Sequence, residues 1–274
     1  MTSTAAGLPD ASIAAPPPSI TFCALASGSR GNALFISSGA TAIIVDAGLS
    51  GREIQKRLSA RNLSSEGIGA IVVSHEHTDH LQGVGVLARR WKIPVYMSPE
   101  TLAAGRRQLG RVDRVTTFHS GKPFSIGSLD VTPFATSHDA ADPVGFTIGS
   151  RDIHIGIATD LGVATANVKM QLKRCALILL EANHDHRMLE QGPYPWPLKQ
   201  RIRGRSGHLS NEDAARLLKE IHHENLRHVL LGHLSETNNT PEKALSAVGG
   251  VLEGTKTRLE AVCQDYCGPL LEIY

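Results

Sequence analysis

The chain has 274 residues, of which 41% are hydrophobic and 20% charged, as is ordinary for a water-soluble globular protein. Its 28 Lys and Arg against 26 Asp and Glu give a formal charge of only +2, which excludes a nucleic-acid-binding signature spread over the whole chain. The sequence contains no apolar run long enough for a membrane span, and the four cysteines lack the paired spacing of a zinc knuckle.

The first eighteen residues are rich in Ala, Pro and Ser, and they lack both a basic segment and a continuous apolar segment. We therefore expect a disordered tail over 1–18 and no secretory signal. With its few unpaired cysteines, the chain is expected to be a reduced, cytoplasmic protein.

From residue 19 the first half alternates short apolar runs with helix-like segments. Strands are predicted over 20–27, 33–39, 41–48, 69–74 and 93–98. Ser50 is expected to cap a helix that ends near Arg61, another helix is expected over 81–90, and Ser98-Pro99 is expected to open a third. The Gly/Ser segment over 27–32 is open to two interpretations, a phosphate-binding loop or an ordinary hairpin turn.

The second half repeats this character. Strands are predicted over 130–137, 145–150, 152–159, 175–181, 227–232 and 258–263, and helices are predicted to start at Ser210 and Thr240. No Pro/Gly-rich linker separates the halves, so 19–274 is expected to be one domain. Strands followed by helices in each half indicate two facing sheets with helices outside, an α/β fold of the αββα sandwich type.

One segment does not fit a purely structural interpretation. The strand over 69–74 runs directly into "SHEHTDH", which places three histidines, a glutamate and an aspartate in six positions. His75 and His77 are two residues apart and would project to the same side of an extended chain, where they could share a metal. Asp79 and His80 follow on the loop, from which they could turn towards a second metal.

Further metal ligands are expected at equivalent places, just after apolar strands. His138 follows 130–137, Asp160 follows 152–159, and His233 follows 227–232. With these residues the sequence resembles the metallo-β-lactamase fold. The resemblance implies that His75, His77 and His138 hold one metal, that Asp79, His80 and His233 hold a second, and that Asp160 bridges them. It also implies that Asp46 orients the site from behind the ligands.

Two segments of the second half resemble the nucleic-acid-processing branch of that superfamily, which includes ribonuclease Z. In that branch a Glu orients a His that lies before a helix, and the His protonates the leaving group. Here the matching residues are Glu181 in "LILLEANHD" and His208 in "SGHLSNE". The alternative, in which His208 merely caps or packs, stays open.

Between them lies "GPYPWPLKQRIRGRSG", which carries Tyr194, Trp196 and four basic residues. If this segment is extended, alternate positions place its four basic side chains on one side, where they would suit phosphate contacts. The four are Lys199, Arg201, Arg203 and Arg205. The alternative is a solvated loop over the core.

The ordered set of motifs is more similar still to the YycJ/WalJ-like branch. Its motifs here include "SGSRGN", "DAGLS", "SHDA", "TDLG", "EANHD" and "HLSETNN". The resemblance implies a metal-dependent nuclease with 5′-to-3′ exonuclease activity on double-stranded DNA, and it places Asn183 and His184 in contact with substrate or behind the site. The expected cofactors are two divalent ions, zinc by ligand type with manganese as the alternative. Asp79, His208 and Glu181 are the expected catalytic residues.

Two other functions compete. One is a hydrolase of small phosphodiesters, thioesters or lactones on the same fold. The other is a binding protein whose metals are structural. The expected partner is nucleic acid, DNA rather than RNA, and no membrane is expected.

Overall fold

A computed structural model describes residues 19–274, so the tail predicted over 1–18 lies outside the described residues. The chain forms two seven-stranded sheets. The first sheet has the order β14-β1-β2-β3-β4-β5-β6. Its strands are β1 (Ile20–Ala26), β2 (Ala33–Ser38), β3 (Thr41–Val45), β4 (Ile68–Val72), β5 (Val95–Met97), β6 (Val115–Thr117) and β14 (Leu271–Ile273).

The second sheet has the order β13-β12-β11-β10-β9-β8-β7. Its strands are β7 (Phe124–Ile126), β8 (Leu129–Ala135), β9 (Val144–Ser150), β10 (Ile153–Ala158), β11 (Leu177–Glu181), β12 (His228–Gly232) and β13 (Arg258–Ala261). Each sheet combines an antiparallel part with a parallel part. The parallel strands are β3 to β6 in the first sheet and β10 to β13 in the second.

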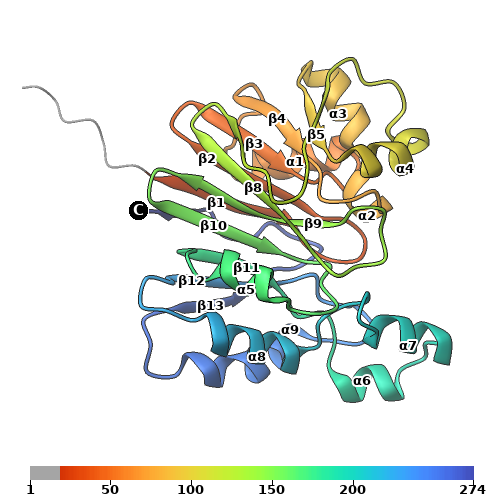
Figure 1. Ribbon diagram of the computed structural model, residues 1–274, viewed down its shortest axis with the longest axis vertical. Helices are drawn as coiled ribbons and strands as arrows, with labels where there is room; N and C mark the ends of the chain where they lie inside the picture. The colour runs from red at the N-terminus through yellow and green to blue at the C-terminus, as the bar shows by residue number, and fades with distance from the viewer. Residues whose placement is uncertain (1–18) are drawn as a thin grey trace, which may run out of the picture.

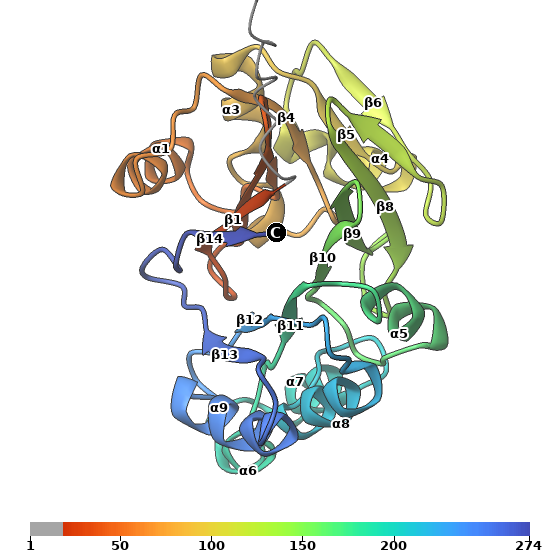
Figure 2. The same cartoon turned by 90° about the vertical axis from the view of Figure 1, so that its left-hand side faces the viewer.

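Helices cover the outer faces of both sheets, so the molecule has the layers helix, sheet, sheet, helix (Figures 1 and 2). On the first sheet lie α1 (Gly51–Ala60), α2 (Thr78–Leu81), α3 (Val84–Trp91) and α4 (Pro99–Leu109). On the side of the second sheet lie α5 (Ala166–Leu172), α6 (His186–Gln191), α7 (Trp196–Arg203), α8 (Asn211–Ile221), α9 (Pro241–Gly249) and the 3₁₀ turn η1 (Gly250–Leu252). The predicted αββα sandwich is confirmed.

The apolar core forms three layers because the strands are buried on both faces. In β1, Phe22 points between the sheets while Cys23 and Leu25 point towards the first helical layer, as the two-residue period of a strand requires. The same alternation in β11 sends Leu177 and Leu179 between the sheets and Ile178 and Leu180 towards α5 and α8. Burial on both faces explains why these strands are continuous apolar runs in the sequence.

The predicted helix starts are confirmed. Ser50, Ser98, Ser210 and Thr240 are N-caps whose side-chain oxygens accept backbone N–H groups of the following turn. The helix expected over 81–90 instead occupies 84–91, because the chain forms the separate short helix α2 before it. The sequence did not reveal β6, β7 and β14, which are only three residues long.

Within residues 19–274 no helix is both long and apolar enough to cross a membrane. The fold brings strand ends of both sheets together on one side. The parallel strands β3 and β4 of one sheet and β10 to β12 of the other all end on the same side of the sandwich, where ligands commonly bind to open α/β sheets.

Candidate metal centre

The polar residues expected to form a site all follow strand ends and converge there. Asp46 follows β3, the "SHEHTDH" segment follows β4, and Asp160 and His233 follow β10 and β12. Asp46, Asp160 and His233 have φ angles of 58°, 56° and 54°. This left-handed conformation is rare for residues other than glycine and turns each chain sharply as it leaves its sheet.

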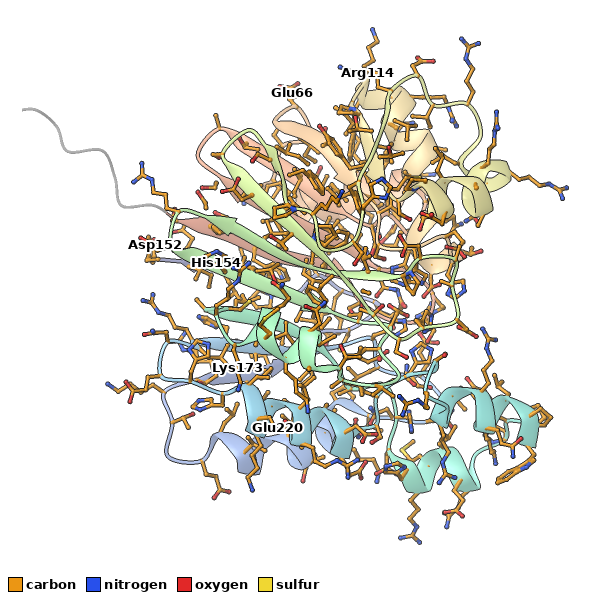
Figure 3. The ribbon with its side chains drawn as sticks, viewed as in Figure 1. Glu66, Arg114, Asp152, His154, Lys173 and Glu220 are labelled. Atoms are coloured by element: carbon orange, nitrogen blue, oxygen red, sulfur yellow. The ribbon has the colours of Figure 1, made fainter. Side chains whose placement is uncertain are left out.

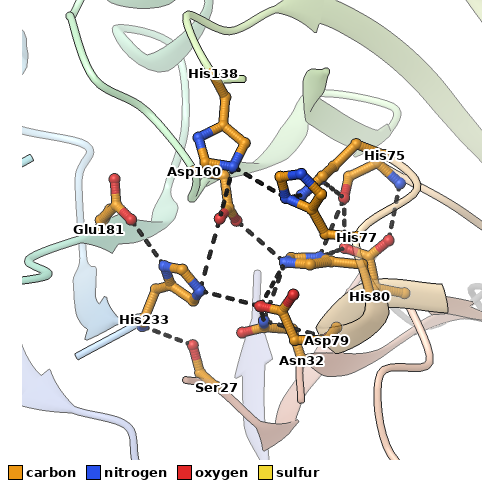
Figure 4. A network of polar contacts seen from close by, with 12 residues as sticks. Ser27, Asn32, His75, His77, Asp79, His80, His138, Asp160, Glu181 and His233 are labelled. Atoms are coloured by element: carbon orange, nitrogen blue, oxygen red, sulfur yellow. Dashed lines mark hydrogen bonds and ion pairs between the residues drawn. The ribbon is translucent and has the colours of Figure 1, made fainter. Parts of the chain in front are cut away.

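Three histidines place one nitrogen each around a common point (Figure 4). His75 Nε2 lies 3.1 Å from His77 Nδ1, and His138 Nε2 lies 3.3 Å from the same His77 Nδ1. Two nitrogens bound tetrahedrally to one zinc ion would lie about 3.3 to 3.4 Å apart. The spacing of this first group therefore fits a metal ion.

A second group lies beside the first. The carboxylate of Asp79 lies 3.4 Å from both His80 Nε2 and His233 Nε2. Asp160 lies between the groups, because its Oδ2 is 3.3 Å from His80 Nε2 and its Oδ1 is 3.7 Å from His138 Nε2. Asp160 is buried, and within the described residues its Oδ2 makes the contact with His80 but no well-aligned hydrogen bond, so a cation could take that place.

On His75, His80 and His138 the other ring nitrogen is held by a buried group. Asp46 Oδ2 lies 2.8 Å from His80 Nδ1, and Ser74 Oγ lies 3.0 Å from His75 Nδ1. The carbonyl oxygen of Gly207 lies 3.1 Å from His138 Nδ1. Such contacts fix the ring orientation and leave the other nitrogen available to a metal. Asp46 also accepts the backbone N–H and hydroxyl of Ser74, each at 2.8 Å, so it fixes the start of the histidine segment as well.

The structure differs from expectation at Asp79 and His80, which do not lie on a loop. Both belong to the first turn of α2, which starts at Thr78. Close backbone packing explains this geometry. A β-carbon on Gly48 would lie only 1.6 Å from the carbonyl oxygen of Asp79, so a glycine is needed where the "DAGLS" segment passes under the helix.

The buried carboxylates strongly affect the pKa values of the candidate histidine ligands. Burial alone would lower the pKa of His80 and of His233, but the nearby carboxylates outweigh it and hold both pKa values well above the usual range. Burial and the neighbouring charge of His80 have the opposite effect on His75, whose pKa lies well below the usual range. A bound cation would replace the protons on His80 and His233 as the partner of these carboxylates.

Glu181 holds two histidines at once. It is fully buried at the end of β11, and its Oε1 lies 2.8 Å from His208 Nδ1 and 2.8 Å from His233 Nδ1. Its Oε2 accepts the backbone N–H groups of Leu161 and Leu209, at 2.9 and 3.0 Å. Burial would raise the pKa of Glu181, but His208 and His233 outweigh it and lower that pKa to about 2. The sequence had linked Glu181 to His208 alone.

Asn183 and His184 lie just after β11 and are both buried. The side-chain amide of Asn183 donates to the carbonyl oxygen of His233 at 2.9 Å, so it fixes the backbone of a candidate ligand. His184 is buried, and neither of its ring nitrogens has a hydrogen-bond partner within the described part of the chain.

The basic segment does not have the extended conformation on which its prediction rested. Residues Trp196–Arg203 form the helix α7, so the four basic side chains do not share one side. Lys199 donates to the carbonyl oxygen of Glu190 at 2.7 Å, and Arg201 forms an ion pair with Asp139 at 2.5 Å. Arg203 and Arg205 are exposed, and Arg205 lies beyond the helix. The expectation failed because Pro197 at the start of α7 favours a helix there.

A cavity of about 200 Å³ opens beside His208, between the metal centre and α7. Its lining includes Tyr194, Arg201, Asp139, Asn183 and Ser29. Asp139 was missed as a site residue, although it directly follows the candidate ligand His138.

Asn32 was also missed, although it belongs to the Gly/Ser segment whose two interpretations were left open. Its side-chain nitrogen lies 3.1 Å from His80 Nε2 and 3.3 Å from Asp79 Oδ2. The segment connects β1 to the antiparallel β2, and the side chain of Asn32 contacts the second group of candidate ligands.

Comparisons with known proteins agree with this geometry. Residues 41–233 match the model of the beta-lactamase superfamily domain. The chain is 37% identical to exodeoxyribonuclease YycJ of Bacillus anthracis over 234 residues, which cover 85% of this chain and 89% of that protein. It is 38% identical to exodeoxyribonuclease WalJ of Streptococcus pneumoniae over 224 residues, 80% of this chain and 83% of the relative.

Solved structures show the same fold at much lower identity. The metallo-beta-lactamase fold protein YhfI of Bacillus subtilis superposes with a TM-score of 0.71 at 15% identity, covering 92% of this chain and 99% of that one. The short form of human tRNase Z superposes with a TM-score of 0.62 at 16% identity, covering 93% and 98%. On the family model and the two curated relatives, the chain belongs to the beta-lactamase superfamily and, within it, to the family of the exodeoxyribonucleases YycJ and WalJ.

Proposed function

We propose that the protein is a metal-dependent exonuclease that removes nucleotides from the 5′ end of double-stranded DNA. The observation that carries the proposal is the position of His208, which is anchored by the buried Glu181 at 2.8 Å and faces a cavity beside the candidate metal ligands. The relatives named exodeoxyribonucleases, which cover most of the chain, support DNA as the substrate.

We further propose that His75, His77 and His138 hold one divalent ion, that Asp79, His80 and His233 hold the other, and that Asp160 bridges them. The ligand distances described above support this assignment. Five imidazoles and two carboxylates favour zinc, with manganese as the alternative. When bound, the two ions supply a water acidic enough to act at neutral pH and stabilise negative charge on the attacked phosphate.

The residues of the chain supply the remaining chemistry. His208 hydrogen-bonds to the Glu181 carboxylate through Nδ1, so a protonated ring would direct its other N–H, on Nε2, towards the leaving oxygen. Proton donation there would prevent an alkoxide from building up as the P–O bond breaks. Because Glu181 already fixes the orientation of the His208 ring, little movement is needed when substrate binds.

The first experiment uses the metal-loaded protein with end-labelled DNA and RNA duplexes, with chelator and Asp160→Ala as controls. Chelator-sensitive, stepwise release from the 5′ end of DNA is the expected result. If both polymers stay intact while a small diester such as bis(p-nitrophenyl) phosphate is hydrolysed, the small-substrate alternative holds instead.

The proposed acid has its own test. In His208→Gln we expect kcat to fall about 10²- to 10⁴-fold on DNA, whose leaving oxygen needs a proton. On bis(p-nitrophenyl) phosphate, whose p-nitrophenolate leaves without one, the loss should be far smaller. Equal losses on both substrates would show that His208 serves the structure or the metals rather than the leaving group.

We also propose that the protein acts in the cytoplasm, on the grounds of its cysteine usage. The region 19–274 is proposed to fold as one unit.

A further inference from the structure

A second concentration of positive charge lies away from α7, on the opposite helical layer. Residues 84–117 contain seven basic residues and only two acidic ones, Glu100 and Asp113. The basic residues are Arg89, Arg90, Lys92, Arg106, Arg107, Arg111 and Arg114, and all seven are exposed. We call this surface the α3–α4 basic face. Its local charge of +5 exceeds the +2 of the whole chain, so the rest of the sequence is net negative.

The charges on α4 are largely uncompensated. Within residues 19–274, Arg106 and Arg107 form no ion pair, and Arg111 pairs only with Asp113 at 3.6 Å, where both side chains are at least 80% exposed. By contrast, Arg201 of α7 is already paired with Asp139 at 2.5 Å. When an unpaired, hydrated arginine binds a phosphate of DNA, the counterions of that phosphate are released. No ion pair within the protein has to break first.

This face borders the metal centre. A β-carbon on Gly105 of α4 would lie 2.5 Å from Leu81 of α2 and 3.3 Å from the β-carbon of Glu76, which stands between the ligands His75 and His77. Figures 1 and 2 show α4 in the upper helical layer and α7 in the lower one, and in Figure 1 both lie at the same end of the sandwich. The metal centre therefore lies between two basic helices, one on each layer.

A groove of about 690 Å³ runs along α4. Leu102, Val112 and Val115 lie in its wall, and Arg106 and Arg111 supply its charge. A polyanion with an apolar sugar edge suits such a lining better than a compact small anion would, because its charge and its apolar surface are both spread along a line.

From these observations we infer that the α3–α4 basic face holds the phosphate backbone of the part of the DNA duplex that remains after cleavage. This inference rests on the proposed function. His208 and α7 lie on the side of the leaving group, so the retained strand must run from the metal centre in another direction. The only other strongly basic surface that borders the centre, among the residues described, is this face.

The test compares the wild-type chain with Arg106→Gln/Arg107→Gln/Arg111→Gln, because glutamine keeps helix propensity while it removes charge. A matched control carries Lys173→Gln/Arg174→Gln/Lys219→Gln. These three exposed residues lie on or near α5 and α8, and Figure 3 shows Lys173 at the opposite end of the molecule from α4. Metal-loaded proteins are titrated with duplexes of about one and about three helical turns that carry cleavage-resistant phosphorothioate 5′ ends, over a range of salt concentrations.

For the longer duplex, the α4 variant should bind at least about tenfold more weakly than wild type at moderate salt, and its log–log salt slope should be less steep by about 2 to 3. The shorter duplex should be weakened as well, because one helical turn is about 34 Å long and the 11 residues of α4 beside the metal centre span only about 16 Å. Equal weakening in the control variant, or unchanged binding in the α4 variant, would overturn the inference. If wild type failed to cleave ordinary DNA, the proposed function itself would fail, whatever the variants did.

Discussion

By position in the sequence, the candidate ligands of the metal centre divide into two halves, which are not the same as the two metal-binding groups described above. In the first half, four candidate ligands come from the six consecutive residues 75–80, and the buried Asp46 holds the segment through Ser74 and His80. In the second half, His138, Asp160 and His233 come from three separate strand ends, and the buried Glu181 holds His208 and His233. Each half thus depends on one buried carboxylate behind its histidines.

Local sequence is enough to form the first half, whereas the second half requires the correct topology of the sheet. The first half is continuous in sequence, so it depends mainly on the turn of α2 against Gly48. The second half exists only when β8, β10, β11 and β12 are correctly aligned in one sheet. Changes in the second half should therefore affect more than one function at once.

The largest expected effect comes from the residue that joins the halves. Asp160→Ala removes the carboxylate whose two oxygens face His80 and His138. We expect DNA cleavage to fall by about 10⁴-fold or more, as when a central catalytic group is removed. Metal analysis of the purified variant should show less than the wild-type content. A variant with full metal content and near-normal cleavage would contradict the bridging role.

The next effect compares the two buried carboxylates directly. Glu181→Gln removes the negative charge beside His208 and His233. Its amide N–H2 would also face donors, because Oε2 now accepts the backbone N–H groups of Leu161 and Leu209. We therefore expect the proposed acid and a proposed metal ligand to fail together, with kcat lower by about 10³-fold. Asp46→Asn should weaken metal affinity by about 10- to 100-fold. Excess metal should restore cleavage in Asp46→Asn but not in Glu181→Gln. If excess metal restored cleavage equally in both variants, Glu181 would act only through metal affinity, as Asp46 does, and the proposed difference between the two carboxylates would be wrong.

The sequence alone predicted more of the first half than of the second. The strand before "SHEHTDH", the cap at Ser50 and the αββα layers followed from apolar periodicity and capping residues, and all three are present. The link from Glu181 to His233 did not follow, because it joins the ends of β11 and β12, whose pairing the sequence does not state. The α7 segment was misread because its alternating charges were given more weight than Pro197.

A smaller effect concerns the charges around the cavity in the second half. In Arg201→Ala/Arg203→Ala we expect kcat/KM on DNA to fall about tenfold or more and its salt dependence to weaken, because phosphate contacts are lost. Arg187→Ala, which alters an exposed arginine of α6, is the control and should change little. If the double variant lost no more activity on DNA than on bis(p-nitrophenyl) phosphate, the cavity would not select nucleic acid.

The smallest expected effect lies at the start of α8, two residues after His208. Ser210 and Asp213 form a capping box, with Asp213 N–H donating to Ser210 Oγ at 3.0 Å and the Ser210 hydroxyl donating to Asp213 at 2.7 Å. By contrast, α2 in the first half starts at Thr78, and its N-cap residue His77 makes no side-chain cap hydrogen bond. Asp213→Ala should therefore lower the free energy of unfolding by about 1 kcal/mol with little change in metal content.

The pH dependence of unfolding distinguishes the loss of this charged cap in Asp213→Ala from a loss of packing. Burial would raise the pKa of Asp213, but the hydrogen bonds from Ser210 and the pairing with Arg216 outweigh it and lower that pKa in the folded protein. The cap therefore contributes fully above the unfolded pKa of about 3.9, and its contribution is lost as the pH falls through the lower folded value. In urea unfolding with chelator present throughout, the gap between wild type and Asp213→Ala should narrow in acid, whereas Lys219→Ala on the same helix should change stability by less than about 0.5 kcal/mol at every pH. A gap that stayed constant into acid would mean that Asp213 stabilises α8 by packing and not by its charge.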